Sequence, residues 1–475
     1  MPGVNLEFAS GSSNHTVVGN SSGHVPLDVE GYPAAPPELE LEQVHIYVRH
    51  GERTPVGIRM AEPPASIPKH WMFCNTARHF RAAVASSGPI IPGVPNMTKD
   101  DSGGMQESLR TVRVVERADG TATSGECLLG ELTDVGRQTT YNFGHALRRL
   151  YIDRLGFLPD VAESNEEIYL RSTNVPRTIE SLQQVIHGLY PDTKLGGDFV
   201  PNLRIRNGKD ENLFGNTLAC KRLEILQIAA ATEWNQVLAA LDPKLSKYVG
   251  GNPIRLDGKP RASGILDTVK AAVAHSIPIP PEFQEPGVVD LIEKAVVNEW
   301  FAALEVAYKC FLIGYKTEEV RRLGMGPLLS DLSRKLAAKA EHGSRDPLKI
   351  LIHSTHDTSL AALCSTLEVF DNRWPAFSSA ITFELFHKRS PLEMQPSIWQ
   401  SVLAPFQRQR ADPLHEHYVR MRYQNRNLPI PACAAEGKHL PGAPEFCTLA
   451  AFRERVLDLT PVDWETECSP AGRPS

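Results

Sequence analysis

Three segments of the chain share one local pattern: an apolar, strand-like run stops at Arg or His residues and passes into a helix. The runs cover residues 44–48, 168–170 and 348–352, and they stop at RHG, RST and HSTHD respectively. Strands that alternate with helices favour an α/β fold whose mainly parallel sheet is covered on both faces. Ligands of such sheets bind at the carboxyl ends of the strands, so the pattern predicts that all three clusters meet there.

Helix signals lie beside these strands. Thr133 can cap a helix between the first two clusters, and Pro176 fits the first turn of a helix after the second. A third helix should follow residue 357, where Leu360, Leu363 and Leu367 recur at helical spacing.

Residues 201–345 read differently, as helical segments with few strand signals. Apolar residues between 289 and 310 recur at steps of three and four, which indicates a packing face, and a further helix is expected to start at Gly326-Pro327. We expect four regions: a flexible tail (1–43), the first part of an α/β domain (44–200), an inserted helical domain (201–345), and the second part of the α/β domain with a C-terminal extension (346–475).

The tail prediction rests on composition. The first 48 residues contain no Lys or Arg and are rich in Gly, Ser and Pro, a composition that buries little apolar surface. They show neither the apolar core of a secretory signal nor the Arg-rich pattern of a mitochondrial transit peptide, which leaves the cytoplasm as the default compartment.

Charge and hydropathy exclude two classes of partner. The 475 residues carry a formal net charge of -6, so no broad basic field is available for nucleic acid. No apolar run is long enough to span a bilayer. The eight cysteines include no CxxC pair, which argues against structural zinc and leaves disulfides or buried thiols open. The oligomeric state is left open as well.

Residues 49–55, with the sequence RHGERTP, carry the clearest chemical signal. Guanidinium groups bind phosphate oxygens through paired, charge-assisted hydrogen bonds, so Arg49 and Arg53 beside His50 would bind an anion and attack it together. Gly51 leaves room where the backbone turns toward a ligand. The alternative interpretation is that His50 is a buried structural histidine and that the two arginines lie on the surface. The position of these residues at the end of a strand argues against it.

The motif RHGxRxP, followed late in the chain by His356-Asp357, resembles the histidine acid phosphatase family. Residues 171–173 are similar to the middle motif of that family. Residues 132–137, 168–178 and 370–375 look closest to the lysophosphatidic acid phosphatase-like subgroup. The likeness covers residues 44–468 and implies a phosphoglycerate mutase-like three-layer sandwich with an inserted helical domain. It also points to the secretory pathway or the mitochondrion.

The resemblance implies a role for each matching residue. His50 is the nucleophile that forms a phosphohistidine, and Asp357 protonates the leaving oxygen. Arg49, Arg53, Arg171 and His356 bind the phosphate, and neither a metal nor another cofactor is implied. Catalysis of this kind is mainly positioning and electrostatics, and a carboxylic acid assists departure of an alkoxide. The implied substrate is a small phosphate monoester, with lysophosphatidic acid as the subgroup inference.

Other polar residues near the motifs read as structural. His353 and His356 would point to opposite faces of a strand, which makes a shared metal awkward, so His353 is assigned to the scaffold. Arg177 and Glu384 are explained equally well by ion pairs within the scaffold and are left outside the site. The resemblance also implies disulfides between Cys220 and Cys468 and between Cys433 and Cys447.

Two rival functions are weighed. A phytase-like hydrolase of myo-inositol polyphosphates shares both end motifs, but the sequence shows no dense Lys cluster near them. A non-catalytic protein that only binds phosphate ligands would be expected to have lost a nucleophile or a proton donor, and all six expected positions are filled. Phosphomutase chemistry, found in distant relatives of the fold, ranks lower still.

Overall fold

A central sheet with helices on both faces organises the chain. The computed structural model describes residues 26–84, 107–197, 199–301, 311–389 and 416–470. Its large sheet has the strand order β10-β11-β8-β7-β1-β6-β4-β5, with β9 pairing to β8. The strands are β1 (Leu39–Arg49), β4 (Ile168–Ser172), β5 (Leu203–Ile205), β6 (Ile350–Thr355), β7 (Ala380–Lys388), β8 (His417–Tyr423), β9 (Arg426–Asn427), β10 (His439–Leu440) and β11 (Ala443–Thr448).

The sheet has a parallel half and an antiparallel half. Strands β1, β6, β4 and β5 run parallel, with Val44 opposite Ile350 and Ile168 opposite the same residue. Strand β7 pairs antiparallel with β1, and β8 with β7. The predicted α/β fold is confirmed, and the C-terminal extension proves to complete the sheet with antiparallel strands.

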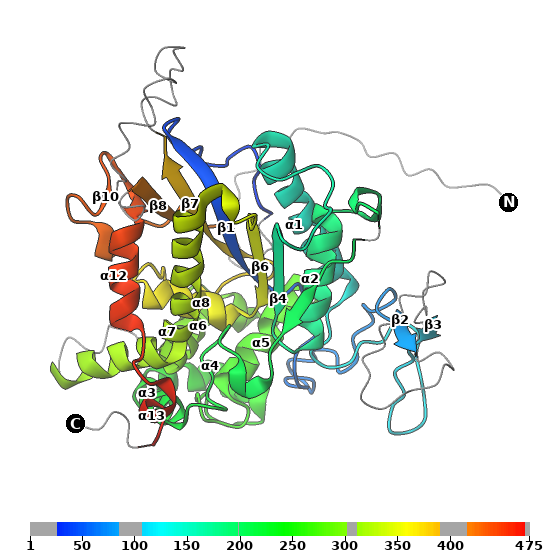
Figure 1. Cartoon of the computed structure of the whole chain (residues 1–475). Helices are drawn as coiled ribbons and strands as arrows, with labels where there is room; N and C mark the ends of the chain where they lie inside the picture. The colour runs from blue at the N-terminus through cyan, green and yellow to red at the C-terminus, as the bar shows by residue number, and fades with distance from the viewer. Residues whose placement is uncertain (1–25, 85–106, 198, 302–310, 390–415, 471–475) are drawn as a thin grey trace, which may run out of the picture.

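Two helical layers cover the sheet. Helices α1 (Asp134–Arg148) and α2 (Pro176–Leu189) pack on one face over a core that includes Val44 and Ile352. Helices α7 (Phe311–His342), α8 (Asp357–Thr366) and α12 (Leu449–Leu459) pack on the other face. Figure 1 shows α1 and α2 on one side of the sheet and α7 and α12 on the other. The predicted helix starts at Thr133 and Pro176 are confirmed, because Thr133 accepts a hydrogen bond from the Gly136 amide and Pro176 is the first residue of α2.

A helical region with its own core lies below the sheet in Figure 1. It includes α3 (Lys221–Leu238), α4 (Asp242–Leu245), α5 (Ala262–Ala274) and α6 (Val288–Phe301), and its core also takes in Ile67 and Trp71 from the loop after β1. The end of the predicted apolar stripe, residues 302–310, lies outside the described residues. No helix in the described ranges is long and apolar enough to cross a membrane.

Two expectations differ from the structure. Pro327 lies inside α7 instead of starting a helix, and Gly326 beside it lets the helix approach the Leu459 carbonyl, where a Cβ would lie 2.2 Å from the oxygen. Of the expected tail, residues 1–25 are outside the described ranges, but residues 26–43 pack on the body. Tyr32 is 5% exposed and hydrogen-bonds to Glu384. This aromatic anchor outweighs the polar composition around it.

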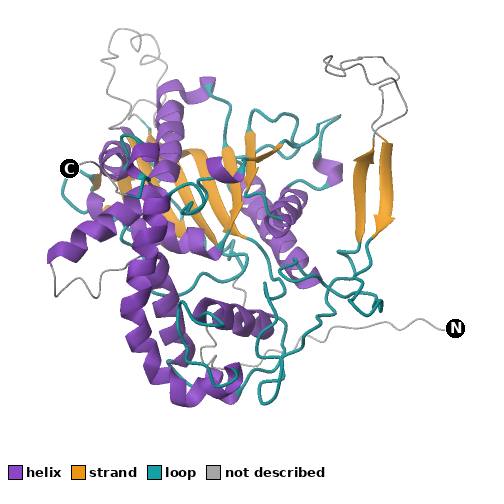
Figure 2. Cartoon of the chain, turned by 90° about the horizontal axis from the view of Figure 1, so that it is seen from below, coloured by secondary structure: helices purple, strands orange, loops and turns teal. Residues whose placement is uncertain are grey.

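Within the described residues, three disulfides and a separate two-stranded hairpin complete the fold. Cys433–Cys447 and Cys220–Cys468 form as the resemblance implies. The second joins the start of α3 to the end of α13 (Trp464–Glu467). A third, Cys74–Cys127, was not anticipated. Between its cysteines, β2 (His79–Val84) and β3 (Glu107–Val112) form a hairpin that stands apart from the body in Figure 2.

Candidate active site

The loop after β1 is held against the sheet and against α2 by hydrogen bonds from its backbone amides. The amide of His50 donates to the Thr355 carbonyl at 3.0 Å, and the amide of Gly51 donates to Ser181 Oγ at 3.1 Å. A Cβ on Gly51 would lie 2.3 Å from the Gly136 carbonyl oxygen at the start of α1. Glycine is therefore required here by the close packing of two backbones.

Hydrogen bonding fixes the tautomer of His50. Its Nδ1 lies 2.9 Å from the carbonyl oxygen of Gly51, which can only accept, so Nδ1 carries the proton and Nε2 keeps its lone pair. Burial, followed by the charges of Arg177, Arg53 and Arg49, lowers the pKa of His50 well below its usual value. The ring is therefore neutral, which is the form that attacks an electrophile.

The end of β6 brings His356 and Asp357 to the same place. The rings of His50 and His356 have centroids 5.6 Å apart, and His356 Nε2 lies 3.1 Å from Thr173 Oγ1. Burial lowers the pKa of His356, and Arg177 adds to the effect. Asp357 begins α8 and forms a 2.6 Å ion pair with Arg49. The first and third clusters therefore meet at the carboxyl edge of the sheet.

Arg49 also contacts the segment after α8. Its Nη1 donates to the Pro375 carbonyl at 2.6 Å, and its guanidinium carbon lies 3.8 Å from the centre of the Phe377 ring. These contacts fix the guanidinium beside Asp357. Burial alone would raise the pKa of Asp357, but Arg49 and Arg53 outweigh it and hold that pKa below its ordinary value. Asp357 is thus an anion in the unliganded protein.

Arg171 points away from His50 and Asp357. Ile168 and Leu170 of β4 face the core beneath α1 and α2, so Arg171 projects to the opposite face of the strand. There it forms an ion pair with Glu211, both side chains being 3% exposed. Glu211 also accepts from the amides of residues 212 and 213, so this pair fixes the loop that carries Phe214.

Arg177, which the sequence reasoning left out, reaches the histidines instead. It lies in the first turn of α2 and lines one cavity together with His50 and His356. Burial and the neighbouring Arg53 lower its pKa to about 10, and among the described residues no hydrogen bond or ion pair satisfies its guanidinium. A half-buried cation without a direct ionic partner is costly unless a ligand supplies an anion. Because successive side chains of β4 point to opposite faces of the sheet, the sequence could have indicated that Arg177, and not Arg171, lies beside the histidines.

Two cavities meet at Arg53, Asp357 and Thr358, which line both. The first, here called the basic arm, has a volume of about 430 Å³ and takes four cationic side chains from the loop after β1 and from the helical region. These are Arg59, Lys259, Arg261 and Lys270. The second, here called the apolar arm, has a volume of about 350 Å³ and contains His50. Its apolar lining includes Val175, Phe214, Leu223, Val320, Met325 and Ala362.

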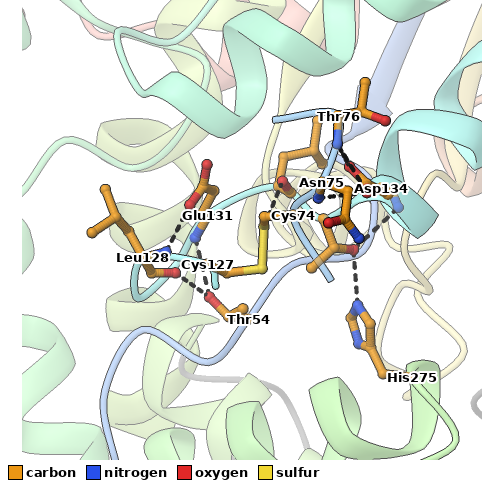
Figure 3. Close-up of a disulfide and its surroundings, with 12 residues drawn as sticks. Thr54, Cys74, Asn75, Thr76, Cys127, Leu128, Glu131, Asp134 and His275 are labelled. Carbon is orange, nitrogen blue, oxygen red and sulfur yellow. Dashed lines mark hydrogen bonds between the residues drawn. A yellow bond between two sulfur atoms is a disulfide. The ribbon is translucent and has the colours of Figure 1, made fainter. Parts of the chain in front are cut away.

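A disulfide supports the loop that carries Arg53. Figure 3 shows Cys74–Cys127 beside Thr54, whose hydroxyl donates to the Leu128 carbonyl at 2.7 Å and accepts from the Glu131 amide at 3.2 Å. On the other side of the bridge, the amide of Asn75 donates to the Asp134 carboxylate at 2.8 Å. The loop is therefore fastened to residues 128–131 through Thr54 and to the start of α1 through Asn75.

Known proteins match this chain over most of its length. It is 32% identical over 465 residues to the "Probable acid phosphatase" of Schizosaccharomyces pombe, covering 92% of this chain and 95% of that one. It is 27% identical over 273 residues to human lysophosphatidic acid phosphatase type 6, covering 56% of this chain and 59% of that one.

Solved structures share the fold at low identity. The phytase of Hafnia alvei in complex with tartrate matches with a TM-score of 0.52 and 16% identity, over 90% of this chain and 99% of that one. A multiple inositol polyphosphate phosphatase of Bifidobacterium longum in complex with inositol hexasulfate matches with a TM-score of 0.51 and 12% identity, over 93% of this chain and 98% of that one. These likenesses confirm the phosphatase fold expected from the motifs.

The model of one protein family matches residues 40–424, a span that contains every residue of the two arms named above. The family and the relatives confirm that the protein is a phosphoric monoester hydrolase, as the motifs indicated. The chain belongs to the histidine phosphatase superfamily, branch 2.

Proposed function

We propose that the protein hydrolyses phosphate monoesters through a phosphohistidine on His50. The supporting observation is the contrast between two neighbours: an imidazole whose Nε2 lone pair is available, and the half-buried guanidinium of Arg177, which among the described residues forms no direct ion pair. Nε2 attacks phosphorus, the P–O bond to the alcohol breaks, and Arg49, Arg53, Arg177 and His356 hold the other phosphate oxygens. In this proposal Arg177 takes the place that the family resemblance gave to Arg171.

Asp357 handles the proton in both steps. It lies at the junction of the two arms, where the leaving oxygen can reach it. In the first step the carboxylic acid gives its proton to the departing alkoxide. In the second step the carboxylate takes a proton from water, whose oxygen attacks phosphorus and releases inorganic phosphate from His50.

The mechanism is tested by trapping the intermediate. Rapid acid-free quenching after mixing with a ³²P-labelled aryl phosphate should label the wild-type protein with a base-stable, acid-labile phosphate. His50→Ala should give neither label nor turnover. A label of the same stability on the His50→Ala protein would overturn the assignment of the nucleophile.

The apolar arm favours a substrate with a hydrocarbon chain, and we infer that a lysophosphatidate-like monoester is the preferred class. Phe214 lies 5.9 Å from the His356 ring, so the apolar lining begins beside the phosphate site. Each methylene buried in the arm should contribute about 0.8 kcal/mol to binding. A series of alkyl phosphates should therefore show kcat/KM rising by about fourfold per methylene until the arm is full.

The basic arm favours a second class, polyphosphates of the phytate type. Lys259 and Arg261 line this arm, and within the described ranges neither side chain forms an ion pair with a carboxylate. Phosphate release from lysophosphatidate and phytate should be compared for the wild type, Phe214→Ser and the double variant Lys259→Ala/Arg261→Ala. A preference for lysophosphatidate that only Phe214→Ser weakens supports the first class. A preference for phytate that only the double variant weakens supports the second.

A further inference from the structure

Asp267 reaches from the helical region to the loop that carries the catalytic histidine. It lies in α5, and its Oδ1 is 2.6 Å from Arg53 Nη1. Its Oδ2 accepts a hydrogen bond from the Val56 amide at 2.9 Å. One carboxylate thus fastens both a guanidinium and the backbone of the loop, and its two oxygens cannot turn independently.

The contact with Asp267 decides which edge of Arg53 remains available. Nη1 is occupied by Asp267 and by the Thr54 carbonyl at 3.0 Å. The Nε atom is buried and has no hydrogen-bond partner within the described part of the chain. A guanidinium binds an oxyanion best through two parallel N–H groups. Anchoring Nη1 therefore leaves the Nε–Nη2 edge for phosphate oxygens.

The negative charge of Asp267 also stabilises Arg53 in its position. Arg53 is buried beside Arg49 and Arg177; burial lowers the pKa of both neighbours, and the charge of Arg53 lowers each further. Arg49 has Asp357 as its counter-ion, and Asp267 plays that part for Arg53. Without it, repulsion among three guanidiniums in a low-dielectric site would favour a position of Arg53 farther from the phosphate.

We propose that Asp267 is a positioning residue, which acts through Arg53 by holding its Nε–Nη2 edge toward the phosphate site. The inference rests on the proposed function and adds a residue from the helical region to it. Arg59, whose Nη1 lies 3.8 Å from Asp267 Oδ2, is a weaker second partner of the same carboxylate.

The chain offers a matched control in Asp242. This carboxylate also bonds a guanidinium, with Arg255 Nη2 2.8 Å from Oδ2, and a backbone amide, that of Ile254, at 2.7 Å. It lies in the helical region and lines neither arm. Asp242→Asn therefore reproduces the loss of a charged anchor without touching Arg53.

Steady-state kinetics with an aryl phosphate tests the proposal. Asp267→Asn should lower kcat by at least about tenfold, as loss of a transition-state contact does. Competitive inhibition by inorganic phosphate should weaken as well, because Arg53 no longer holds its Nε–Nη2 edge toward the bound oxygens. Asp242→Asn should keep the wild-type kcat. Thermal unfolding of both variants, with kcat expressed per folded molecule, separates this effect from lost stability.

A double-mutant cycle tests whether Asp267 acts through Arg53. Arg53→Lys replaces the fork by a point charge, so Asp267→Asn should change kcat by less than about twofold in that background. Additive losses, or a wild-type kcat for Asp267→Asn, would overturn the inference. Because His50→Ala is tested by the absence of a labelled intermediate, the inference can fail while the proposed function stands.

Discussion

Arg49 and Asp357 form a buried ion pair, with 2.6 Å between Nη2 and Oδ2, at the point where the two arms meet. The pair keeps Asp357 ionised before substrate arrives. A phosphate that binds the same guanidinium competes for its charge and makes protonation of the carboxylate easier. The pair therefore links phosphate binding to the supply of the proton.

Asp357→Asn should separate substrates by the basicity of their leaving group. An alkoxide needs a proton as it departs, whereas an activated phenolate does not. We expect kcat for an alkyl phosphate to fall by about 10²- to 10⁴-fold, and kcat for a nitrophenyl phosphate to fall much less in the first step. Burst kinetics, which isolates that step, is the measurement. Equal losses for both substrates would contradict the assigned role.

Arg177→Ala should reduce activity, whereas Arg171→Ala should reduce stability. Loss of Arg177 removes a phosphate ligand, so kcat/KM should fall by about 10²-fold or more while the melting temperature changes little. Loss of Arg171 leaves Glu211 buried without its partner and should cost about 3 to 5 kcal/mol of stability. Activity measurements and denaturant unfolding on both variants test this contrast. The assignment is wrong if Arg171→Ala is stable and inactive.

The pH profile follows from two lowered pKa values. His50 stays neutral well into the acidic range because its pKa is depressed, so its protonation should not limit kcat/KM at mildly acidic pH. The pKa of Asp357 is also lowered, so in the unliganded protein it is ionised and the proton must arrive with the substrate. Phosphate monoesters lose their second proton near pH 6. We expect kcat/KM for an alkyl phosphate to be highest at acidic pH and to fall above about pH 6. A kcat/KM that does not change up to pH 8 would contradict the inference that the proton arrives with the substrate.

The Cys74–Cys127 bridge should affect both stability and activity. The chain-entropy model gives about 4 kcal/mol for this bridge and about 3 kcal/mol for the shorter Cys433–Cys447 loop. Cys74→Ser/Cys127→Ser should also lower kcat, because the bridge flanks the hydrogen bonds that hold Thr54. Cys433→Ser/Cys447→Ser is the control and should lose stability alone. Chemical denaturation and kcat per folded molecule distinguish the two pairs.

Local patterns predicted the parts of the site that lie close together in sequence. The loop of residues 49–55 and the His356-Asp357 pair each follow a strand, and their meeting at one sheet edge follows from parallel topology. Arg171 was assigned to the phosphate site because its motif was interpreted without the side-chain geometry of the strand that carries it. The alternation of β4 would have turned Arg171 to the opposite face, whereas Arg177 in the first turn of α2 stays at the sheet edge.

Long-range pairs limited what could be predicted elsewhere. Strand β8 carries Arg420 and Arg422, which are both buried. Two arginines in one segment favour an exposed strand when only the sequence is known, and it is the fold that shows Glu384 of β7 pairing with both. Asp267 likewise gains its meaning only from the fold, since no motif connects α5 with Arg53. Ion pairs between distant segments leave no periodic signal in a single sequence, so half of the sheet and one residue beside the site stayed hidden.

The bridge between Cys220 and Cys468 makes a closed covalent ring of everything from the start of α3 to the end of α13. A protease that cuts this ring once cannot release a fragment. The nicked molecule should migrate as a single species on a non-reducing gel and separate into two pieces only after a thiol is added. Helices α5 and α8, with Asp267 and Asp357, would thus stay tethered to the body of the enzyme after such a cut.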